Sequence, residues 1–247
     1  GANMVLGLNA LTIYDLVEFG NEEQTKMAMD YYKRTGHPPF VLGFSEPGAG
    51  SDNMNMSTVA KEVDGKILLS GQKTWVSNGA FSDYVLVVAK DDDPARTNNK
   101  MSWWLVPTDR EGVRFVPLEK IGNKIMPFGD LFLDDVVVTE ADRVGEKGKG
   151  FFQLMKNFEF ERVVAVAMIL GEAQAALEDA AKYSLQRYTF EKPIASYQLI
   201  QQKLVDMEIA VRNTRNWVYE CAWRMDNGLD VRLHTSLLKR YGAPACW

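Results

Sequence analysis

The segment Tyr84-Val-Leu-Val-Val-Ala89 decides the fold, because a short, continuous apolar run of this kind is typical of a buried strand. A similar run, Ser102-Trp-Trp-Leu-Val106, follows it and ends at Pro107, which lacks the amide hydrogen that a strand needs. The centre of the chain is therefore expected to be a β-structure with two buried strands.

Further strands surround these two. Residues 57–60 and 66–70 read as strands joined at Asp64-Gly65, a dipeptide that tolerates positive φ and that predicts a hairpin. Residues 112–117 and 131–138 add two more strands. Short strands at this spacing, separated by Gly, Pro and Asp turns, predict an antiparallel β-sandwich or barrel.

Helical signals precede the strands. Asn21 can cap the free amide groups of a helix, and Glu22 and Glu23 lie in its first turn at the positive end of the helix dipole. Gly36 and Pro38 end this helix. We expect its buried stripe to consist of Met27, Tyr31 and Tyr32.

From Gly150 onward the pattern is helical again. Residues 151–187 contain no proline and predict one long helix. Ser196 is expected to cap a second long helix that ends at Asn227-Gly228, and a third helix begins near Asp230. The second helix carries an apolar stripe typical of a bundle, formed by Leu204, Met207, Val211, Thr214, Val218, Cys221 and Met225.

These patterns predict an α+β multidomain chain. Residues 1–37 would be a remnant of a helical domain, residues 38–148 a middle antiparallel β-barrel or sandwich, and residues 149–247 an incomplete C-terminal helical bundle. Strands and helices do not alternate as βαβ units, so a doubly wound dinucleotide-binding fold is not expected.

Composition excludes several classes of function. The chain has 247 residues, of which 46% are hydrophobic, and no run of about twenty apolar residues exists, so no membrane span is expected. A formal net charge of −5 argues against a nucleic-acid partner. Cys221 and Cys246 cannot build a disulfide scaffold or a zinc site, and they suit the reducing cytoplasm. The 2 histidines lie in separate regions, so neither a metal site nor a Ser-His-Asp set is expected.

An enzyme of this composition would use a carboxylate base and a cofactor. Leu42–Asp52 contains glycines that allow a ligand to approach the backbone, although a surface turn explains them equally well. In Gly71–Gly79, Trp75 beside Ser77 can hold a flat ring and bond its edge, or Trp75 can be a core residue.

A third segment, Phe158-Glu-Phe-Glu161-Arg162, lies in the middle of a predicted helix. Apolar neighbours can raise the pKa of a carboxyl group toward the range of a general base. The alternative is a solvated helix face on which Arg162 pairs with Glu159, three residues earlier.

In this order and spacing, the three segments resemble the acyl-CoA dehydrogenase family. The resemblance extends to Leu131–Val138, Gly145–Phe151, Arg187–Phe190 and Tyr197-Gln198. Within the family, the helical tract is most similar to crotonobetainyl-CoA reductase and its acyl-CoA dehydrogenase relatives. The closer likeness lies in residues 198–203 and 219–228.

The resemblance implies FAD as cofactor, an acyl-CoA thioester as substrate, an electron-transfer flavoprotein as partner and a homotetramer. It implies that the chain is shorter than the family at both ends. The cofactor-binding residues that it implies are Leu42, Phe44, Ser45, Gly50, Ser51, Trp75, Val76, Ser77, Arg187, Thr189 and Gln198. The substrate-binding residues that it implies are Ser51, Phe158, Glu159 and Arg162.

The resemblance also implies roles. Trp75 would cover the flavin ring and Ser77 would bond its edge, while Arg187 would meet the FAD pyrophosphate of a neighbouring subunit. Glu191 stands where the family has glycine. Glu161 would be the catalytic acid/base that takes the α-proton while the β-hydrogen leaves as hydride to flavin N5.

Two other functions fit the same residues. One is an acyl-CoA oxidase or a flavin monooxygenase relative, which oxygen consumption with substrate would reveal. The other is a catalytically silent fragment, or a protein retained as a binding partner, for which a colourless, monomeric product would be evidence.

Overall fold

The computed structural model describes residues 2–92, 100–122, 124 and 126–246. The chain divides into two compact units, Gly1–Asn157 (unit 1) and Phe158–Trp247 (unit 2). The division falls within the long helix α3 (Gly150–Gln186), so that helix contributes to both units.

Two helices open unit 1, α1 (Ala2–Phe19) and α2 (Glu22–Thr35). The predicted cap is confirmed: the Asn21 side chain accepts the Gln24 amide at 2.9 Å, and the Gln24 side chain accepts the Asn21 amide at 3.1 Å. The prediction of the buried stripe is wrong, because all three of its residues, Met27, Tyr31 and Tyr32, are only half-buried. The buried residues of α2 are instead Gln24 and Ala28.

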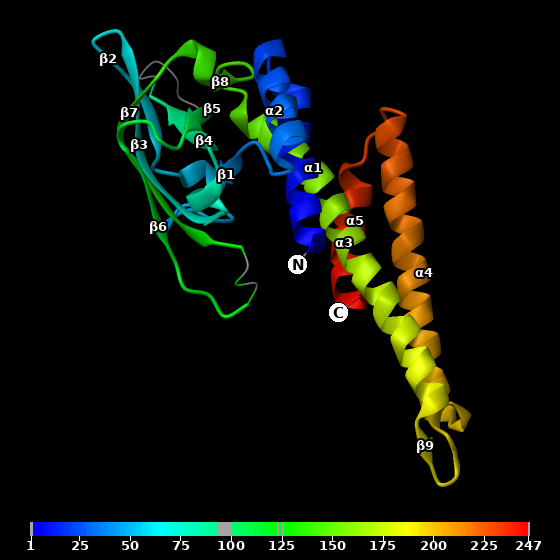
Figure 1. Cartoon of the computed structure of the whole chain (residues 1–247). Helices are drawn as coiled ribbons and strands as arrows, with labels where there is room; N and C mark the ends of the chain where they lie inside the picture. Colours follow the sequence, from blue (N-terminus) through cyan, green and yellow to red (C-terminus); the bar gives the residue numbers. More distant parts are fainter. Residues whose placement is uncertain (1, 93–99, 123, 125, 247) are drawn as a thin grey trace. The chain divides into compact units, whose positions relative to one another are not determined.

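Unit 1 also contains one mixed sheet (Figure 1). Its strand order is β6-β7-β3-β2-β4-β5-β8, with β1 also paired to β4. The β1–β4 and β2–β4 pairs are parallel, which the antiparallel prediction missed. The strands are β1 Val41–Gly43, β2 Val59–Val63, β3 Lys66–Ser77, β4 Tyr84–Asp91, β5 Met101–Pro107, β6 Val113–Pro117, β7 Phe128–Val138 and β8 Arg143–Val144. Short 3-10 turns lie at Asn53–Asn55, Gly79–Phe81 and Glu140–Asp142.

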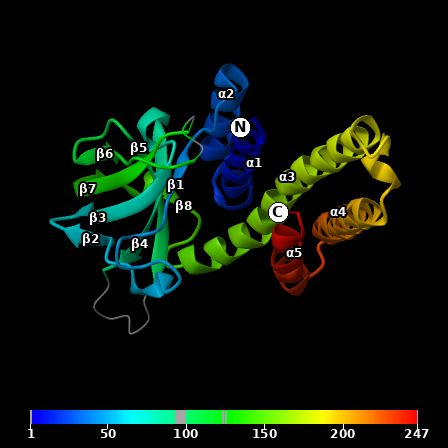
Figure 2. The same ribbon diagram turned by 90° about the horizontal axis from the view of Figure 1, so that it is seen from below.

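The strands share one core. One buried cluster draws residues from β1 through β5 and from β7, among them Val41, Ala60, Leu69, Trp104 and Leu131. The strands therefore present one face to a common interior, and Figure 2 shows how they are arranged around it. The predicted hairpin between β2 and β3 is confirmed, because Asp64 and Gly65 both have positive φ, 50° and 76°.

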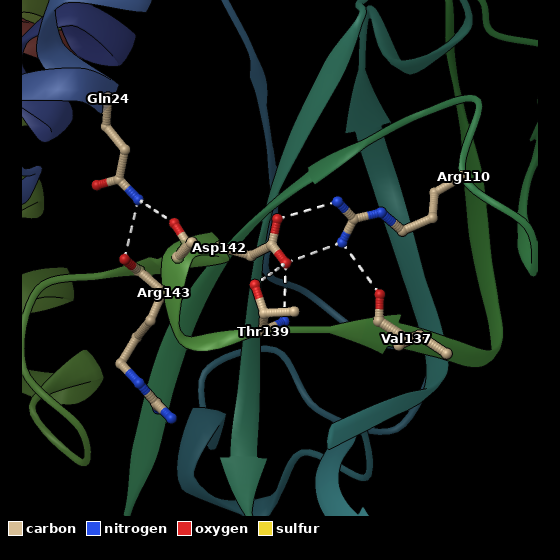
Figure 3. Close-up of polar contacts among 7 residues, drawn as sticks. Gln24, Arg110, Val137, Thr139, Asp142 and Arg143 are labelled. Carbon is tan, nitrogen blue, oxygen red and sulfur yellow. Dashed lines mark hydrogen bonds and ion pairs between the residues drawn. The ribbon is translucent and has the colours of Figure 1, made fainter. Parts of the chain in front are cut away.

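A polar network ties helix α2 to the turn before β8 (Figure 3). The Gln24 amide donates to the carbonyl oxygens of Ala141 at 3.1 Å and Arg143 at 2.9 Å. On the other side of that turn, Arg110 makes two 3.0 Å bonds to the Asp142 carboxylate. A bidentate pair of this kind fixes orientation as well as distance, so the turn is held from two sides.

Unit 2 is helical. The long helix α3 ends in a hairpin, β9 (Tyr188–Thr189) and β10 (Lys192–Pro193), and a 3-10 turn at Ile194–Ser196 leads into α4 (Gln198–Asp226) and α5 (Arg232–Ala245). The expected Ser196 cap is wrong, because α4 begins after Tyr197 and has no side-chain cap. Asn227-Gly228 ends α4 as predicted, with Gly228 at φ 64°.

The predicted apolar stripe of α4 is confirmed as part of the core of unit 2. Val211, Val218 and Cys221 are buried in one cluster with residues of α3 and α5. Gly242 of α5 lets the helices approach closely, because a Cβ atom there would lie 2.6 Å from Cγ1 of Val166 on α3. The part of the chain that the structure describes has no helix both long and apolar enough to cross a membrane.

Candidate functional site

Trp75 occupies an unusual position on β3. The pairing of β3 with β7 is interrupted by an irregularity between Lys73 and Val76, and Trp75 lies within it at φ 61°. A bulge re-aims side chains, and left-handed backbone at a bulky residue is strained, as is often found at functional sites. The Trp75 ring is 59% exposed and stacks on Phe128, with 5.5 Å between ring centroids and 30° between planes. The alternative interpretation as a core tryptophan is therefore wrong.

The neighbours of Trp75 point in different directions. Val76 is 1% exposed and belongs to the β core, so its side chain does not share the surface on which Trp75 lies. Ser77 is half-buried at the end of β3, and the following Asn78 donates its amide to the Pro127 carbonyl at 2.8 Å. Trp75 and Ser77 thus remain available as an aromatic surface and a hydroxyl on the same strand end.

The structure brings the Leu42–Ser51 segment beside Trp75. The Thr74 amide donates to the Ser45 carbonyl at 2.8 Å, so the glycine-containing segment lies against β3 one residue before the tryptophan. Leu42, Phe44 and Ser45 are half-buried, while Gly50 and Ser51 are exposed. Two segments that lie far apart in the sequence therefore form one surface within unit 1.

A buried ion pair lies beneath this surface, and sequence analysis missed it. Lys73 Nζ lies 2.8 Å from Glu46 Oε1, and the two side chains are 0% and 2% exposed. Burial lowers the pKa of Lys73 to about 8, although the Glu46 carboxylate opposes that shift. Burial alone would raise the pKa of Glu46, but the Lys73 ammonium and hydrogen bonds from Ser57 lower it to about 2.

The candidate acid/base lies in unit 2. Glu161 on α3 is half-buried, and burial raises its pKa, while the positive charges of Lys239 and Arg162 act in the opposite direction. A raised pKa suits a carboxyl group that must take and return a proton near neutral pH. Lys239 belongs to α5, which follows α3 only after a long helix, and no sequence signal linked it to Glu161.

Glu159 does not lie on a solvated helix face. It is 5% exposed, and Arg232 Nε of α5 lies 3.5 Å from its carboxylate oxygen. Arg162 and Phe158, the other substrate residues predicted on this helix, are half-buried. The interpretation of this segment as a solvated surface is therefore wrong, and Arg232 is a neighbour that sequence analysis did not identify.

Arg187, Thr189 and Gln198 lie together at the hairpin between α3 and α4, and all three are exposed. The Arg187 carbonyl accepts the Ile194 amide at 2.9 Å, and the Thr189 carbonyl accepts the Tyr197 hydroxyl at 3.1 Å. At 1.5 Å per helical residue, this hairpin is about 39 Å from Glu161 along α3. The structure therefore does not bring these three residues to Glu161.

The turn of this hairpin departs from ordinary backbone geometry. Phe190 and Glu191 have φ values of 45° and 63°. Left-handed backbone favours glycine, so Glu191 adopts a conformation that is strained for a residue with a side chain. Among the residues that the structure describes, no group of His, Cys, Asp and Glu side chains forms a metal site.

Comparison with known proteins agrees with this geometry. The sequence model of the acyl-CoA dehydrogenase middle domain matches residues 41–136, and that of the acyl-CoA dehydrogenase C-terminal domain matches residues 148–247. The probable acyl-CoA dehydrogenase YdiO of Escherichia coli (strain K12) is 39% identical over 243 residues, which cover 98% of this chain and 63% of YdiO.

Solved structures are similar to this chain over nearly its whole length, among them the following two. Butyryl-CoA dehydrogenase from Megasphaera elsdenii superposes with a TM-score of 0.89 at 30% identity, covering 98% of this chain and 63% of its own. The prolyl acyl carrier protein oxidase AnaB superposes with a TM-score of 0.91 at 27% identity, covering 98% and 64%. This chain thus spans less than two thirds of the length of these relatives.

Proposed function

Because this chain belongs to the acyl-CoA dehydrogenase family, we propose that it forms part of a flavin-dependent oxidoreductase that acts on the CH–CH group of an acyl-CoA thioester. In this proposal residues 1–37 are the end of an N-terminal helical domain. Residues 38–148 form the middle domain, and residues 149–247 form part of the C-terminal helical domain.

Trp75 carries the proposal. A tryptophan that is 59% exposed, on strained backbone and stacked from one side by Phe128, offers a planar apolar surface to a flat ring. The flavin ring of FAD is such a group, so the residues present fit it. FAD would supply the acceptor for the hydride that leaves the substrate.

Polar groups around Trp75 match the edge of such a ring. Ser77 on the same strand offers a hydroxyl, and Ser45 offers another from the adjoining segment, where its carbonyl is already held by the Thr74 amide at 2.8 Å. Gly50 and Ser51 at the exposed end of that segment would meet the phosphate side of FAD and the CoA chain. Val76 is buried in the core and is left out of this set.

Arg187 would bind the pyrophosphate of the FAD that is held by a second copy of the chain. The long separation from Glu161 along α3 prevents the hairpin from completing the site of its own helix. Its exposed guanidinium is suited to a pyrophosphate, which it can bind by two parallel hydrogen bonds. A homo-oligomer, such as a tetramer, follows from this assignment.

Glu161 would take the proton from Cα of the acyl group while the hydrogen on Cβ leaves as hydride. In the reductive direction the same carboxyl group would return that proton to Cα. Its raised pKa supports both roles, because a carboxylate held away from water is a stronger base than a solvated one. Glu159 and Arg162, on the same helix, would hold the CoA portion.

The test is substrate-dependent bleaching of the flavin under anaerobic conditions. Glu161→Gln should keep FAD bound and reduce the bleaching rate by about 10²–10⁴-fold, the contribution of a positioned acid/base. Glu172→Gln, on the exposed side of the same helix, should bleach at the normal rate. Undiminished bleaching in Glu161→Gln would overturn the assignment of the base.

The electron acceptor and the direction of the reaction can be determined with the same enzyme preparation. AnaB, which is described as an oxidase, supports a second candidate in which dioxygen accepts the electrons. The alternative acceptor is an electron-transfer flavoprotein, and a solved structure described by that name is also similar to this chain, with a TM-score of 0.89. Oxygen consumption with acyl-CoA separates the two. A panel of acyl- and enoyl-CoA esters, crotonobetainyl-CoA included, would assign the direction.

A further inference from the structure

The Lys73–Glu46 ion pair lies in the interior of unit 1. Both side chains are at most 2% exposed. A buried ion pair is often no more stabilising than well-packed apolar residues of the same size. We therefore ask which parts of the chain this pair holds in position.

Lys73 makes its two hydrogen bonds to oxygen within one short stretch of chain, and its third contact is to the Met56 sulfur at 3.8 Å. Lys73 Nζ donates to the Glu46 carboxylate at 2.8 Å and to the Phe44 carbonyl at 3.2 Å. The next residue of β3, Thr74, donates its amide to the Ser45 carbonyl at 2.8 Å. Consecutive residues of β3 therefore hold consecutive residues of the Leu42–Ser51 segment.

Glu46 extends the same connection to the start of β2. Its carboxylate accepts the Ser57 amide at 2.5 Å, the Ser57 hydroxyl at 2.6 Å and the Thr58 amide at 2.9 Å. A carboxylate with these bonds is fixed in position, so the ammonium group of Lys73 that bonds to it is fixed as well. The pair thus joins three segments of unit 1 at the base of the surface that carries Trp75.

We propose that Lys73 and Glu46 are positioning residues for the cofactor. Their ion pair holds residues 44–46 in register with β3, and Trp75 and Ser77 follow on that strand. The pair therefore sets where the ring surface and the hydroxyl groups meet the flavin. This inference rests on the proposed function, in which those residues bind FAD.

The experiment compares FAD affinity with the stability of the protein without FAD. Lys73→Met leaves the Glu46 charge buried and unpaired, so it should lower the melting temperature. The double variant Lys73→Met with Glu46→Gln removes both charges but offers the Ser57 and Thr58 donors one acceptor oxygen in place of two, so it should lower the melting temperature less than Lys73→Met alone. The double variant should still bind FAD about tenfold more weakly, because the bond to the Phe44 carbonyl is lost. The visible spectrum or reduction potential of its bound flavin should also shift.

A milder variant guards against misfolding. Ser57→Ala removes one of the four hydrogen bonds that the Glu46 carboxylate accepts, and Ser57 is exposed. This variant should lower the melting temperature only slightly, because three bonds to the Glu46 carboxylate remain, while FAD binding weakens about threefold, the effect of one modest hydrogen bond.

Arg110→Met is the matched control. Arg110 also forms an ion pair, with Asp142, and a bond to a carbonyl, that of Val137 at 3.0 Å (Figure 3). Val137 pairs with Leu68, at the other end of β3 from Trp75. Arg110→Met should lower the melting temperature and leave FAD affinity and the flavin spectrum unchanged.

The outcomes separate the two claims. If the unmodified protein does not bind FAD, the proposed function fails. If it binds FAD, and both the double variant and Ser57→Ala bind FAD with unchanged affinity and spectrum, the positioning role of Lys73 and Glu46 is overturned while the proposed function stands. Loss of FAD affinity in Arg110→Met equal to that in the double variant would also overturn the positioning role.

Discussion

Gly71→Ala should destabilise unit 1 for two separate reasons. Gly71 has φ 150°, a backbone conformation that costs other residues about 1–3 kcal/mol. A Cβ atom at this position would also lie 2.5 Å from Oγ1 of Thr58, 2.7 Å from its Cα and 2.8 Å from its Cβ. Thr58 is fully buried, so the overpacking adds about 1–3 kcal/mol. The expected loss in the free energy of unfolding is the sum, about 2–6 kcal/mol.

Gly65→Ala is the matched control for this variant. Gly65 also has positive φ, 76°, but a Cβ atom there would meet nothing within 4 Å. Only the backbone term remains, about 1–2 kcal/mol. The difference between the two variants in urea denaturation, followed by tryptophan fluorescence, therefore measures the steric cost at Gly71 together with any extra backbone cost of φ 150° over φ 76°.

A third variant tests the origin of the clash. Thr58→Ala removes Oγ1 but keeps Cα and Cβ, so it should restore little stability to Gly71→Ala. The reasoning would be refuted if Gly71→Ala lost no more stability than Gly65→Ala, because the close approach of β3 to Thr58 would then be absent.

Three further perturbations have expected outcomes. The pKa of Glu46 is about 2 in the folded chain, below its ordinary 4.5, so its contribution to stability is complete above about pH 4.5 and is lost as the pH falls toward 2. The free energy of unfolding of Glu46→Gln should therefore fall less steeply between these two pH values than that of the unmodified protein. An identical pH dependence would refute this prediction. Burial raises the pKa of Cys221 to about 11, so mass spectrometry should find it unalkylated by iodoacetamide at neutral pH until the chain unfolds, and rapid native alkylation would contradict its burial. Gly242→Ala should destabilise unit 2 by about 1–3 kcal/mol, and adding Val166→Ala should recover part of that loss in thermal melts, whereas purely additive losses would contradict the contact.

Local sequence signals predicted the elements that depend on neighbouring residues. Asn21 capped its helix and Asp64-Gly65 formed its hairpin, because both structures are set by backbone geometry within a few residues. Ser196 failed as a cap for the same kind of reason: the chain makes one more 3-10 turn before α4 begins at Gln198. The parallel pairing of β1 and β2 with β4 depends on contacts between distant segments, which a strand pattern does not contain.

The site was predictable only in part. The motifs identified Trp75 and Ser45, but the exposure of Trp75 depends on a bulge against β7 that no residue pattern announces. A lysine in a strand is ordinarily a surface residue, so nothing in the sequence placed Lys73 inside. Arg232 on α5 is separated from Glu159 on α3 by the whole of α4 in the sequence. The two meet through the packing of α5, whose orientation periodicity alone does not predict.

The most direct test of the central claim, that unit 1 carries a flavin-binding surface at Trp75, is an FAD titration of the protein and two tryptophan variants. Trp75→Ala should weaken FAD binding by about tenfold or more, the typical effect of removing a stacked aromatic ring. Trp223→Ala is the matched control, because Trp223 is 58% exposed, nearly as much as Trp75, but lies on α4 in unit 2. It should leave FAD affinity unchanged. Equal FAD affinity in Trp75→Ala and the unmodified protein, or no FAD binding at all, would contradict the account.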